Sequence, residues 1–455
     1  MTTVVHRHLT PLGRTPAAAT RAVELGASFY WRDGASGLNF RALGEPLAFG
    51  PDGGHASALE PRSVSFEHHS DDHATSERLP AWLHALGFDP TAAREAGSPW
   101  AAWPRSASWL PEQLIVTTPD GSSFAITHAV DGDAKSVEAF VARAVRFAEA
   151  ARRALALTTR EPSRPTATAA PVAFDEAAHA RFVGRVERAQ RALACGSLSK
   201  VVLARSEMVT GPGRFDPERQ LSALAQAAPR AIVFGWWHGD AGTWLGATPE
   251  VLARVGEGFV TTSAIAGTAR RSDDPEGCAL AADRKCLHEH ALVVSAMRAA
   301  LEPLVVDLVV RERPSVLLSE RLVHLETPMR ARLDGHGLLA LARALHPTPA
   351  LGGSPRDAAL AWLREHEGLD RGHFGAPIGW ESPSGDGVLA VGIRAALVRE
   401  SSAVLFAGAG LVEGSDPEAE WRETVSKLEL ARSTLMPSGP AGSLGVRPVG
   451  EEARA

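Results

Sequence analysis

Apolar and polar positions alternate along the chain with the two periods that are typical of strands and helices. In the first third, short apolar runs flank a Pro-Asp-Gly turn at residues 118–121, and we predict a hairpin over residues 114–126. Residues 134–157 are rich in Ala, Val and Arg and show a helical period, as do residues 174–194. Both segments are therefore predicted to be helices.

The remainder of the chain alternates predicted strands with predicted helices. We expect a hairpin over residues 243–255, turning at Thr248-Pro249, and helices over residues 283–301 and 417–435. Interleaved hairpins and helices favour an α/β (α+β) fold with large, mostly antiparallel sheets and helices packed outside. The other strands expected here are residues 200–204, 231–237, 260–265, 389–397 and 403–407.

Composition shifts suggest how the chain is organised. Residues 158–171 (TTREPSRPTATAAP) are rich in Pro, Thr and Ala, and we interpret residues 161–173 as a linker or surface crossing. Residues 1–160 have no obvious core of their own, so we expect them to pack onto residues 174–436 as one compact unit. Residues 437–455 are predicted to be a disordered tail.

Charge and cysteine usage narrow the class of protein. The 455 residues carry 47 basic and 53 acidic side chains, a net charge of −6, which argues against a nucleic-acid or anionic-membrane binder. No apolar run approaches the length of a membrane span. Three cysteines without a CxxC pair favour reduced thiols in the cytoplasm. The single tyrosine, Tyr30, makes tyrosine chemistry improbable, and we expect a globular cytoplasmic enzyme.

The last predicted helix carries the clearest candidate site. Glu420, Glu423 and Lys427 fall at i, i+3 and i+7, which places them within one narrow face. Two carboxylates and an amine on one face suit a hard divalent cation beside a bound anion. A solvated face with an ordinary Glu–Lys pair is the alternative, and the helix alone does not decide between them.

A second helix, at residues 283–301, contains His288, Glu289 and His290. The two histidines lie about 200° apart around a helix, so they cannot converge on one zinc ion. Glu289 facing Mg²⁺ and a merely polar helix N-terminus both fit this pattern.

Several strand ends carry further candidates. Lys200 opens a buried strand, where loss of hydration would favour a neutral amine that acts as a base, although a snorkelling strand-end lysine is equally compatible. Glu250 follows a turn, and Arg394 lies in an apolar run and needs an anionic partner if buried. Gly408-Ala409-Gly410 lacks the remaining features of a dinucleotide-binding fingerprint.

The order of these features resembles the chorismate-binding enzymes, which include isochorismate synthases, salicylate synthases, anthranilate synthase large subunits and aminodeoxychorismate synthases. The resemblance spans roughly residues 174–435 and implies the fold of anthranilate synthase component I. Its blocks are KVVLAR, GATPE, AIAGT, KCLHEH, HLET, LHPTPALGGSPR, DRGHFGAPIGW, VGIRAA and FAGAGLVEGSDPEAEWRETVSK.

The resemblance implies a role for each matching residue. Lys200 matches the general base that activates water, and Glu250 the general acid that protonates the departing hydroxyl. Glu289 and Glu423 match direct Mg²⁺ ligands, and Glu420 a carboxylate that assists through water. The residues that match the substrate-binding set are Gly267, Thr268, His324, Thr348, Arg394, Gly408 and Lys427.

Two positions favour one branch of the family. Ala266 stands where aminodeoxychorismate synthases carry a lysine nucleophile, and Ala264 where anthranilate synthases usually have proline. The resemblance thus implies a Mg²⁺-dependent isochorismate synthase that adds water at ring C2 of chorismate with loss of the C4 hydroxyl, for menaquinone or siderophore biosynthesis. We expect a monomer with no obligatory protein partner. A salicylate synthase with pyruvate-lyase activity and an anthranilate synthase component I-like subunit are the alternatives.

Overall fold

The computed structural model describes residues 3–14, 27–49, 64–70, 72–92, 94, 97–130, 136–157, 175–318, 322–435 and 445–447. The strands are β1 (Thr3–Arg14), β2 (Ala27–Asp33), β3 (Asn39–Phe49), β4 (Val64–His68), β5 (Trp82–Ala85), β6 (Ala107–Thr117), β7 (Ser122–Val130), β8 (Lys200–Thr210), β9 (Ile232–Trp237), β10 (Thr243–Thr248), β11 (Val251–Gly256), β12 (Phe259–Arg270), β13 (Val305–Val310), β14 (Ser315–Leu318), β15 (Leu322–Leu333), β16 (Gly353–Ser354), β17 (Pro377–Glu381), β18 (Gly387–Val391), β19 (Ala395–Arg399), β20 (Ser402–Leu411) and β21 (Gly445–Arg447). The helices are α1 (His73–Arg78), α2 (Val137–Leu157), α3 (Glu176–Ala194), α4 (Pro217–Ala227), α5 (Cys278–Ala282), α6 (Arg284–Leu301), α7 (Leu338–Leu345), α8 (Arg356–His366) and α9 (Pro417–Thr434).

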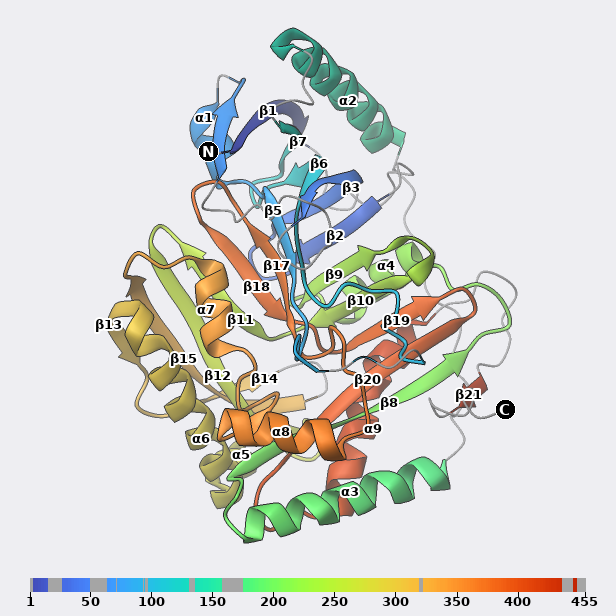
Figure 1. Cartoon of the computed structure of the whole chain (residues 1–455), viewed down its shortest axis with the longest axis vertical. Helices are drawn as coiled ribbons and strands as arrows, with labels where there is room; N and C mark the ends of the chain where they lie inside the picture. The colour runs from blue at the N-terminus through green and yellow to red at the C-terminus, as the bar shows by residue number, and fades with distance from the viewer. Residues whose placement is uncertain are drawn as a thin grey trace.

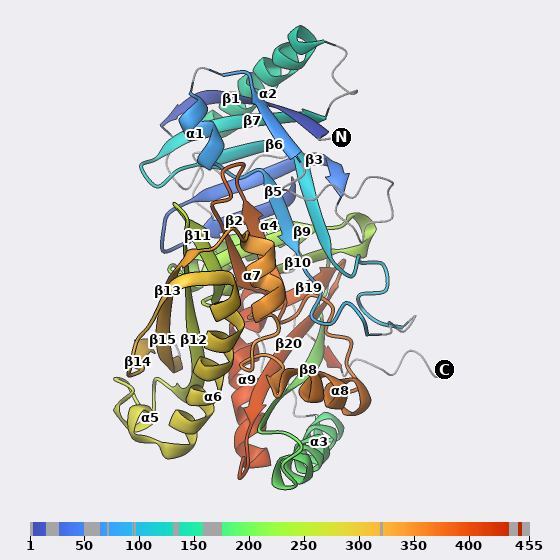
Figure 2. The same ribbon diagram turned by 60° about the vertical axis from the view of Figure 1, so that its left-hand side comes forward.

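The strands join into a branched sheet in which the described pairings are antiparallel, except that β1 runs parallel to β4. One arm passes through β2, β9, β10, β19 and β20 to β8. The other leaves β6 through β5, β17, β18, β11 and β12 to β15. Figures 1 and 2 show both arms running away from the N-terminal strands. The predicted mixed, mostly antiparallel α/β fold is confirmed.

A single apolar core joins the two arms. It contains Val201 and Leu411 from the β8–β20 arm and Ala266 and Val391 from the β12–β18 arm, all at most 7% exposed. Helix α9 packs on β20, and α6 packs on β12. The sheet arms and their helices thus face one another across the lower part of the molecule in Figure 2.

Aromatic side chains connect the N-terminal strands to the rest of the chain. Trp109 stacks on Trp236 with ring centroids 5.1 Å apart, and Trp103 meets Trp236 edge-on at 4.9 Å. Trp100 meets Trp244 edge-on at 5.0 Å. These rings belong to a core shared by strands from both halves of the sequence. Such buried rings contribute a large apolar area in addition to the strand pairing.

Most of the predicted elements are confirmed. The hairpin around residues 118–121 is the β6–β7 pair, in which Thr117 lies opposite Ser123. Helices α2, α3, α6 and α9 occupy the four segments predicted to be helical. At the start of α9, the Asp416 carboxylate accepts the Ala419 N–H at 3.1 Å, and Pro417 occupies the first turn, where its missing N–H costs nothing.

Two strand predictions were wrong, and both errors fall where the chain crosses between the arms. The hairpin predicted over residues 243–255 does not form, because β10 pairs with β9 and β19 while β11 pairs with β12 and β18. The single strand predicted over residues 389–397 is two strands, β18 and β19, separated at Gly392-Ile393-Arg394. Buried residues on both sides of each crossing make the apolar pattern look continuous.

The predicted tail is also partly wrong. Residues 445–447 form β21, which pairs antiparallel with β8 so that Gly445 lies opposite Thr210. The rest of residues 437–455, and the linker predicted at residues 161–173, lie outside the described residues.

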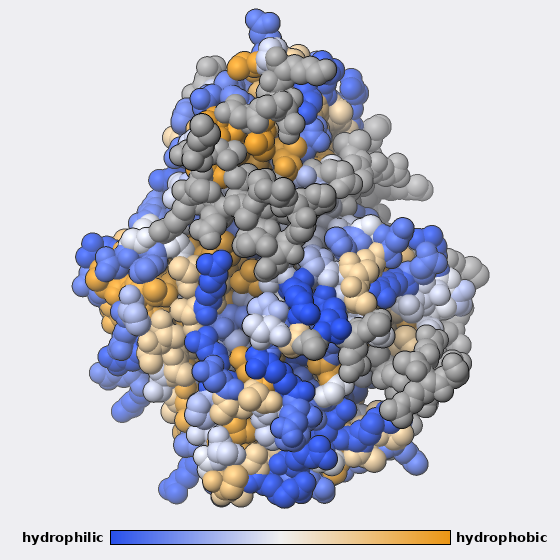
Figure 3. All heavy atoms as spheres, viewed as in Figure 1, coloured by the Kyte–Doolittle hydropathy of each residue, from blue (hydrophilic) through white to orange (hydrophobic). Residues whose placement is uncertain are grey.

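Within the part of the chain that the structure describes, no helix combines the length and apolar character needed to cross a membrane. Figure 3 shows polar residues over most of the described surface of one face. The large apolar side chains that the described residues expose are Val137 and Val145 on α2, Phe259 on β12, Val309 on β13 and Leu318 on β14.

Candidate active site

A cavity of about 160 Å³ lies between the two arms of the sheet. It is lined from β8 and β20 on one arm, from β12 and β15 on the other, and from α6 and α9. Of the twelve candidate site residues, the cavity brings eleven together. These are Lys200, Glu250, Gly267, Thr268, Glu289, His324, Arg394, Gly408, Glu420, Glu423 and Lys427.

Thr348 is the exception. It does not line the cavity, and its side chain is 2% exposed with no hydrogen-bond partner for Oγ1. Its backbone carbonyl accepts the N–H groups of Leu351 and Gly352, each at 2.9 Å, and Leu351 does line the cavity. In this structure Thr348 therefore shapes the loop behind the cavity wall.

Lys200 is buried at the cavity end of β8. Its side chain is 1% exposed, and Nζ lies 2.7 Å from Oε1 of Glu289 on α6. The alternative of a snorkelling lysine is wrong, because a snorkelling amine would lie in solvent and this side chain is almost completely buried. Gly410 on β20 makes room for this pair, since a Cβ there would lie 2.7 Å from Oε1 of Glu289 and 3.3 Å from Cε of Lys200.

Glu250 and Arg394 are neighbours because each lies where the chain crosses between the arms. The Glu250 carbonyl accepts the Val391 N–H at 3.0 Å, and the Arg394 carbonyl accepts the Ala247 N–H at 3.2 Å. The two crossings thus run side by side at the cavity. Arg394 adopts a φ of +52°, a conformation that non-glycine residues seldom take and that sets it apart from the adjoining strands.

The environment of Glu250 favours its protonated form. Burial raises the pKa of Glu250 to about 7, and the opposing charges of Arg394, Lys427 and Lys200 offset only part of that effect. A carboxyl that titrates near neutral pH holds its proton in a large fraction of molecules, as a general acid must.

Arg394 supplies a positive charge to the cavity. Burial lowers the pKa of Arg394, although Glu423 and Glu250 oppose the shift, and the guanidinium stays charged at neutral pH. Among the described residues, no carboxylate forms an ion pair with it. A cavity-lining guanidinium in this state is suited to an anionic ligand.

Besides Glu250, three carboxylates line the cavity, and each of these three contacts a lysine. Glu289 pairs with Lys200, Glu423 with Lys427 at 2.5 Å, and Glu420 with Lys285 at 3.2 Å. The alternative of a solvated helix face is wrong for Glu420, which is 4% exposed.

These carboxylates supply the oxygen donors that suit the Mg²⁺ that the resemblance implies, although their oxygens do not all lie within 4.8 Å of one another in this structure. Burial raises the pKa of Glu420, and the negative charge of Glu423 raises it further against the effect of Lys285. The buried Glu420 and the half-buried Glu423 repel one another, and a hard divalent cation would stabilise such a donor set. Glu289, Glu420 and Glu423 are the residues that would hold it.

A bulge in β12 positions Thr268 next to His324 on the opposite wall of the cavity. Gly267 adopts a φ of +77° at the shift in register between Ala266 and Thr268, which only glycine accommodates easily. Thr268 then lies opposite His324 on β15, and its Oγ1 is 2.9 Å from Nδ1 of the ring. Burial and the charges of Arg394 and Lys427 lower the pKa of His324 to about 3, so its imidazole is neutral.

Gly408 and Lys427 close the remaining side. The Lys427 amine donates to the Gly408 carbonyl at 2.8 Å as well as to Glu423, which fixes its position over β20. Gly408 lies opposite Ala204 of β8, so these contacts tie α9 to the central strands of this arm.

Several residues that line the cavity were not predicted from the sequence. Lys285, Gly410 and Arg371 line the cavity and received no role. Arg371 is 4% exposed and donates to both carboxylate oxygens of Glu367 and to the carbonyls of Leu351 and Val202, so it organises the wall. A signal for Lys285 was its position one turn before Glu289 on the same helix.

Comparison of the chain with known protein families shows which family it belongs to. The profile described as "Chorismate binding enzyme" matches residues 8–436. The chain belongs to the chorismate-binding enzyme family. The match extends the resemblance noted over residues 174–435 across nearly the whole chain.

Individual relatives of this chorismate-binding enzyme agree with that assignment. The chain is 38% identical over 360 residues to a salicylate biosynthesis isochorismate synthase of Pseudomonas aeruginosa, covering 77% of this chain and 73% of that protein. It is 29% identical over 428 residues to the isochorismate synthase MenF of Bacillus subtilis, covering 90% and 88%. The structure of MenF from Escherichia coli, a menaquinone-specific isochorismate synthase, matches with a TM-score of 0.74 at 22% identity over 96% of this chain and 95% of that one. This last likeness establishes the fold.

Proposed function

We propose that the protein is an isochorismate synthase that converts chorismate to isochorismate with the help of Mg²⁺. The observation that carries the proposal is the single cavity that holds a buried amine, Lys200, and a carboxyl that titrates near neutral pH, Glu250. Replacing one ring hydroxyl by another requires such a base and acid. The family and the isochorismate synthases among the relatives support this choice of substrate.

In the proposed reaction, Lys200 removes a proton from a water molecule as its oxygen bonds to ring C2. The ring double bonds shift, the C4–oxygen bond breaks, and Glu250 gives its proton to the departing hydroxyl, which leaves as water. One water enters and one leaves, so substrate and product are isomers. Lys200 accepts the proton only as a neutral amine, so its contact with Glu289 must weaken before the step.

Chorismate is a dicarboxylate, and the cavity offers positive groups for it inside a protein of net charge −6. Arg394 and Lys427 supply charge from two walls, and His324 and Thr268 supply neutral donors from a third. Bound at Glu289, Glu420 and Glu423, Mg²⁺ would neutralise those carboxylates and orient a substrate carboxylate.

Among the relatives are enzymes of salicylate and of menaquinone biosynthesis. We propose that isochorismate from this protein supplies menaquinone or siderophore biosynthesis. The monomeric state and the cytoplasmic location stay predictions.

The test is incubation of the purified chain with chorismate and Mg²⁺, followed by chromatographic identification of the product. The proposal expects isochorismate and no pyruvate. Pyruvate together with salicylate would instead identify a salicylate synthase with lyase activity. Anthranilate formed from added ammonia would identify an anthranilate synthase component I-like subunit. Unchanged chorismate would overturn the proposal.

A further inference from the structure

Histidine and glutamate side chains that do not line the cavity gather around the N-terminal elements β1, β4 and α1. Within the described residues, two sets of three donors lie with all their ligand atoms within 4.8 Å of one another, and both sets are here. One set is His6, Glu67 and His69; the other is His68, His73 and Glu77. The reaction proposed above uses none of these residues.

The parallel register of β1 and β4 creates the first set. His6 lies opposite Glu67, and side chains two residues apart in an extended segment point to the same face. His69, two residues after Glu67, therefore joins them, and its N–H is held by the Arg7 carbonyl at 2.9 Å. Two short patterns, His-x-His at residues 6–8 and Glu-x-His at residues 67–69, thus meet on one face.

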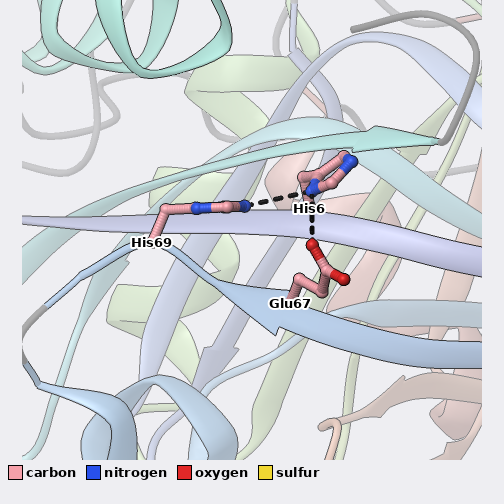
Figure 4. Close-up of side chains that lie close together, drawn as sticks. All are labelled: His6, Glu67 and His69. Carbon is pink, nitrogen blue, oxygen red and sulfur yellow. Dashed lines mark hydrogen bonds and ion pairs between the residues drawn. The ribbon is translucent and has the colours of Figure 1, made fainter. Parts of the chain in front are cut away.

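The donor atoms converge on one point. Nδ1 of His6 lies 3.0 Å from Nε2 of His69 and 3.3 Å from Oε2 of Glu67. Figure 4 shows the imidazole of His69 and the carboxylate of Glu67 both directed at the His6 ring. Two ligands of a tetrahedral zinc ion, each about 2.0–2.2 Å from it, lie about 3.3–3.6 Å apart, so small rotations would admit the ion.

The surroundings hold the ligands in place. His8 on β1 donates Nδ1–H to the His69 carbonyl at 2.6 Å, which fixes the backbone that carries one ligand. Phe140 of α2 packs on the rings of His6 and His69, with centroids 6.0 and 5.7 Å away, and walls the group on that side. His6 is 8% exposed, whereas the Glu67 side chain is 57% exposed and leaves a route for an ion.

The second set is less suitable. His68 lies next to the buried Arg7, whose positive charge opposes a cation there, and its Nε2 is 3.5 Å from Glu77. The first set includes a carboxylate in direct contact with an imidazole, at 3.3 Å.

We propose that His6, Glu67 and His69 bind one divalent transition-metal ion of the Zn²⁺ class, with water completing the coordination. Two imidazoles and one carboxylate are zinc ligands, whereas Mg²⁺ prefers oxygen alone. The site is separate from the carboxylates of the cavity. The bound metal ion links the edge strand β4 to β1, in addition to the backbone hydrogen bonds between the two strands.

The experiment measures Zn²⁺ binding to the full-length chain freed of metal by chelation, with excess Mg²⁺ present to occupy the cavity carboxylates. Equilibrium dialysis with metal analysis, and titration calorimetry, should give one Zn²⁺ per chain. Glu67→Gln, a change at an exposed side chain, should weaken that binding by at least about tenfold, and His69→Gln should abolish it. Zn²⁺ should raise the unfolding temperature of the wild type and not that of His69→Gln.

The matched controls are His73→Gln, in the second set, and His336→Gln, an exposed histidine after β15. Both should keep wild-type binding. Loss of binding in His73→Gln with retention in His69→Gln would place the ion at the second set and overturn the proposal. Wild-type binding that persists in His69→Gln and Glu67→Gln would also overturn it, as would a wild type that binds no Zn²⁺ at micromolar concentration.

Discussion

Glu250 shows how the position of a residue in the fold can change its protonation. Its sequence context is a turn after Pro249, which resembles any exposed loop. The turn instead carries the chain from one arm of the sheet to the other, and burial at that crossing raises the pKa of the carboxyl to about 7. The residue pattern identified Glu250 only with the help of the family blocks, because the crossing depends on strand pairing across the whole chain.

The pKa of Glu250 predicts a pH dependence with a definite sign. The acid form dominates below pH 7 and is lost as the pH rises through about 7, so kcat/KM should fall on the alkaline side. Glu250→Gln should lower kcat by about 10²–10⁴-fold and remove that fall from the pH profile. Glu276→Gln, at an exposed position, is the control and should keep both rate and profile. The same alkaline fall in Glu250→Gln would assign it to another group.

A second prediction at the scale of single residues concerns Lys200. Lys200→Ala should lose about 10²–10⁴-fold in turnover while chorismate still binds, because the base acts mainly in the transition state. Single-turnover rates and binding measured by tryptophan fluorescence separate the two effects. Wild-type turnover at saturating chorismate would show that the lysine has only a structural role.

At the scale of elements, α9 carries two carboxylates and one amine of the site and packs on β20. The helical spacing of Glu420, Glu423 and Lys427 was readable from the sequence because a helix fixes which side chains share a face. The sequence pattern placed Arg394 inside one continuous strand over residues 389–397, since nothing in its apolar neighbours marks the break between β18 and β19. Local periodicity predicts elements well, but it carries no information on which strands pair.

Gly410 on β20 offers a test of this arrangement. Gly410→Ala would bring a Cβ to 2.7 Å from Oε1 of Glu289, so the carboxylate and Lys200 must move apart. We expect a folded protein with at least about tenfold lower kcat and a higher Mg²⁺ requirement. Gly256→Ala, at the end of β11 with no atom within 4 Å of its Cβ, is the control. Unchanged Mg²⁺ dependence in Gly410→Ala would contradict the role given to Glu289.

The metal assignment makes a direct prediction for α9. Glu423→Gln removes one negative charge while keeping shape, so activity should fall steeply and added Mg²⁺ should restore it only in part. The measurement is initial rate against Mg²⁺ concentration. Full activity with a wild-type Mg²⁺ requirement would remove Glu423 from the metal site.

At the scale of the whole molecule, the N-terminal strands pair with the strands that follow, β2 with β9 and β5 with β17. The core that contains the buried tryptophans is also shared between them. Cleavage within residues 158–171 should therefore leave the two fragments associated in gel filtration, unfolding in one transition. Two separately folded fragments would contradict the expectation of one compact unit. The sequence suggested this only indirectly, through the lack of a core in the first 160 residues.

The central claim is that Lys200 activates a solvent water that becomes the new ring hydroxyl. The most direct measurement is the reaction of chorismate in water enriched in oxygen-18, with the isochorismate analysed by mass spectrometry. The account predicts one solvent oxygen in each product molecule made by the wild type, and labelled product from Lys200→Ala formed about 10²–10⁴-fold more slowly. Isochorismate that forms without solvent oxygen, or labelled product from Lys200→Ala at the wild-type rate, would contradict it.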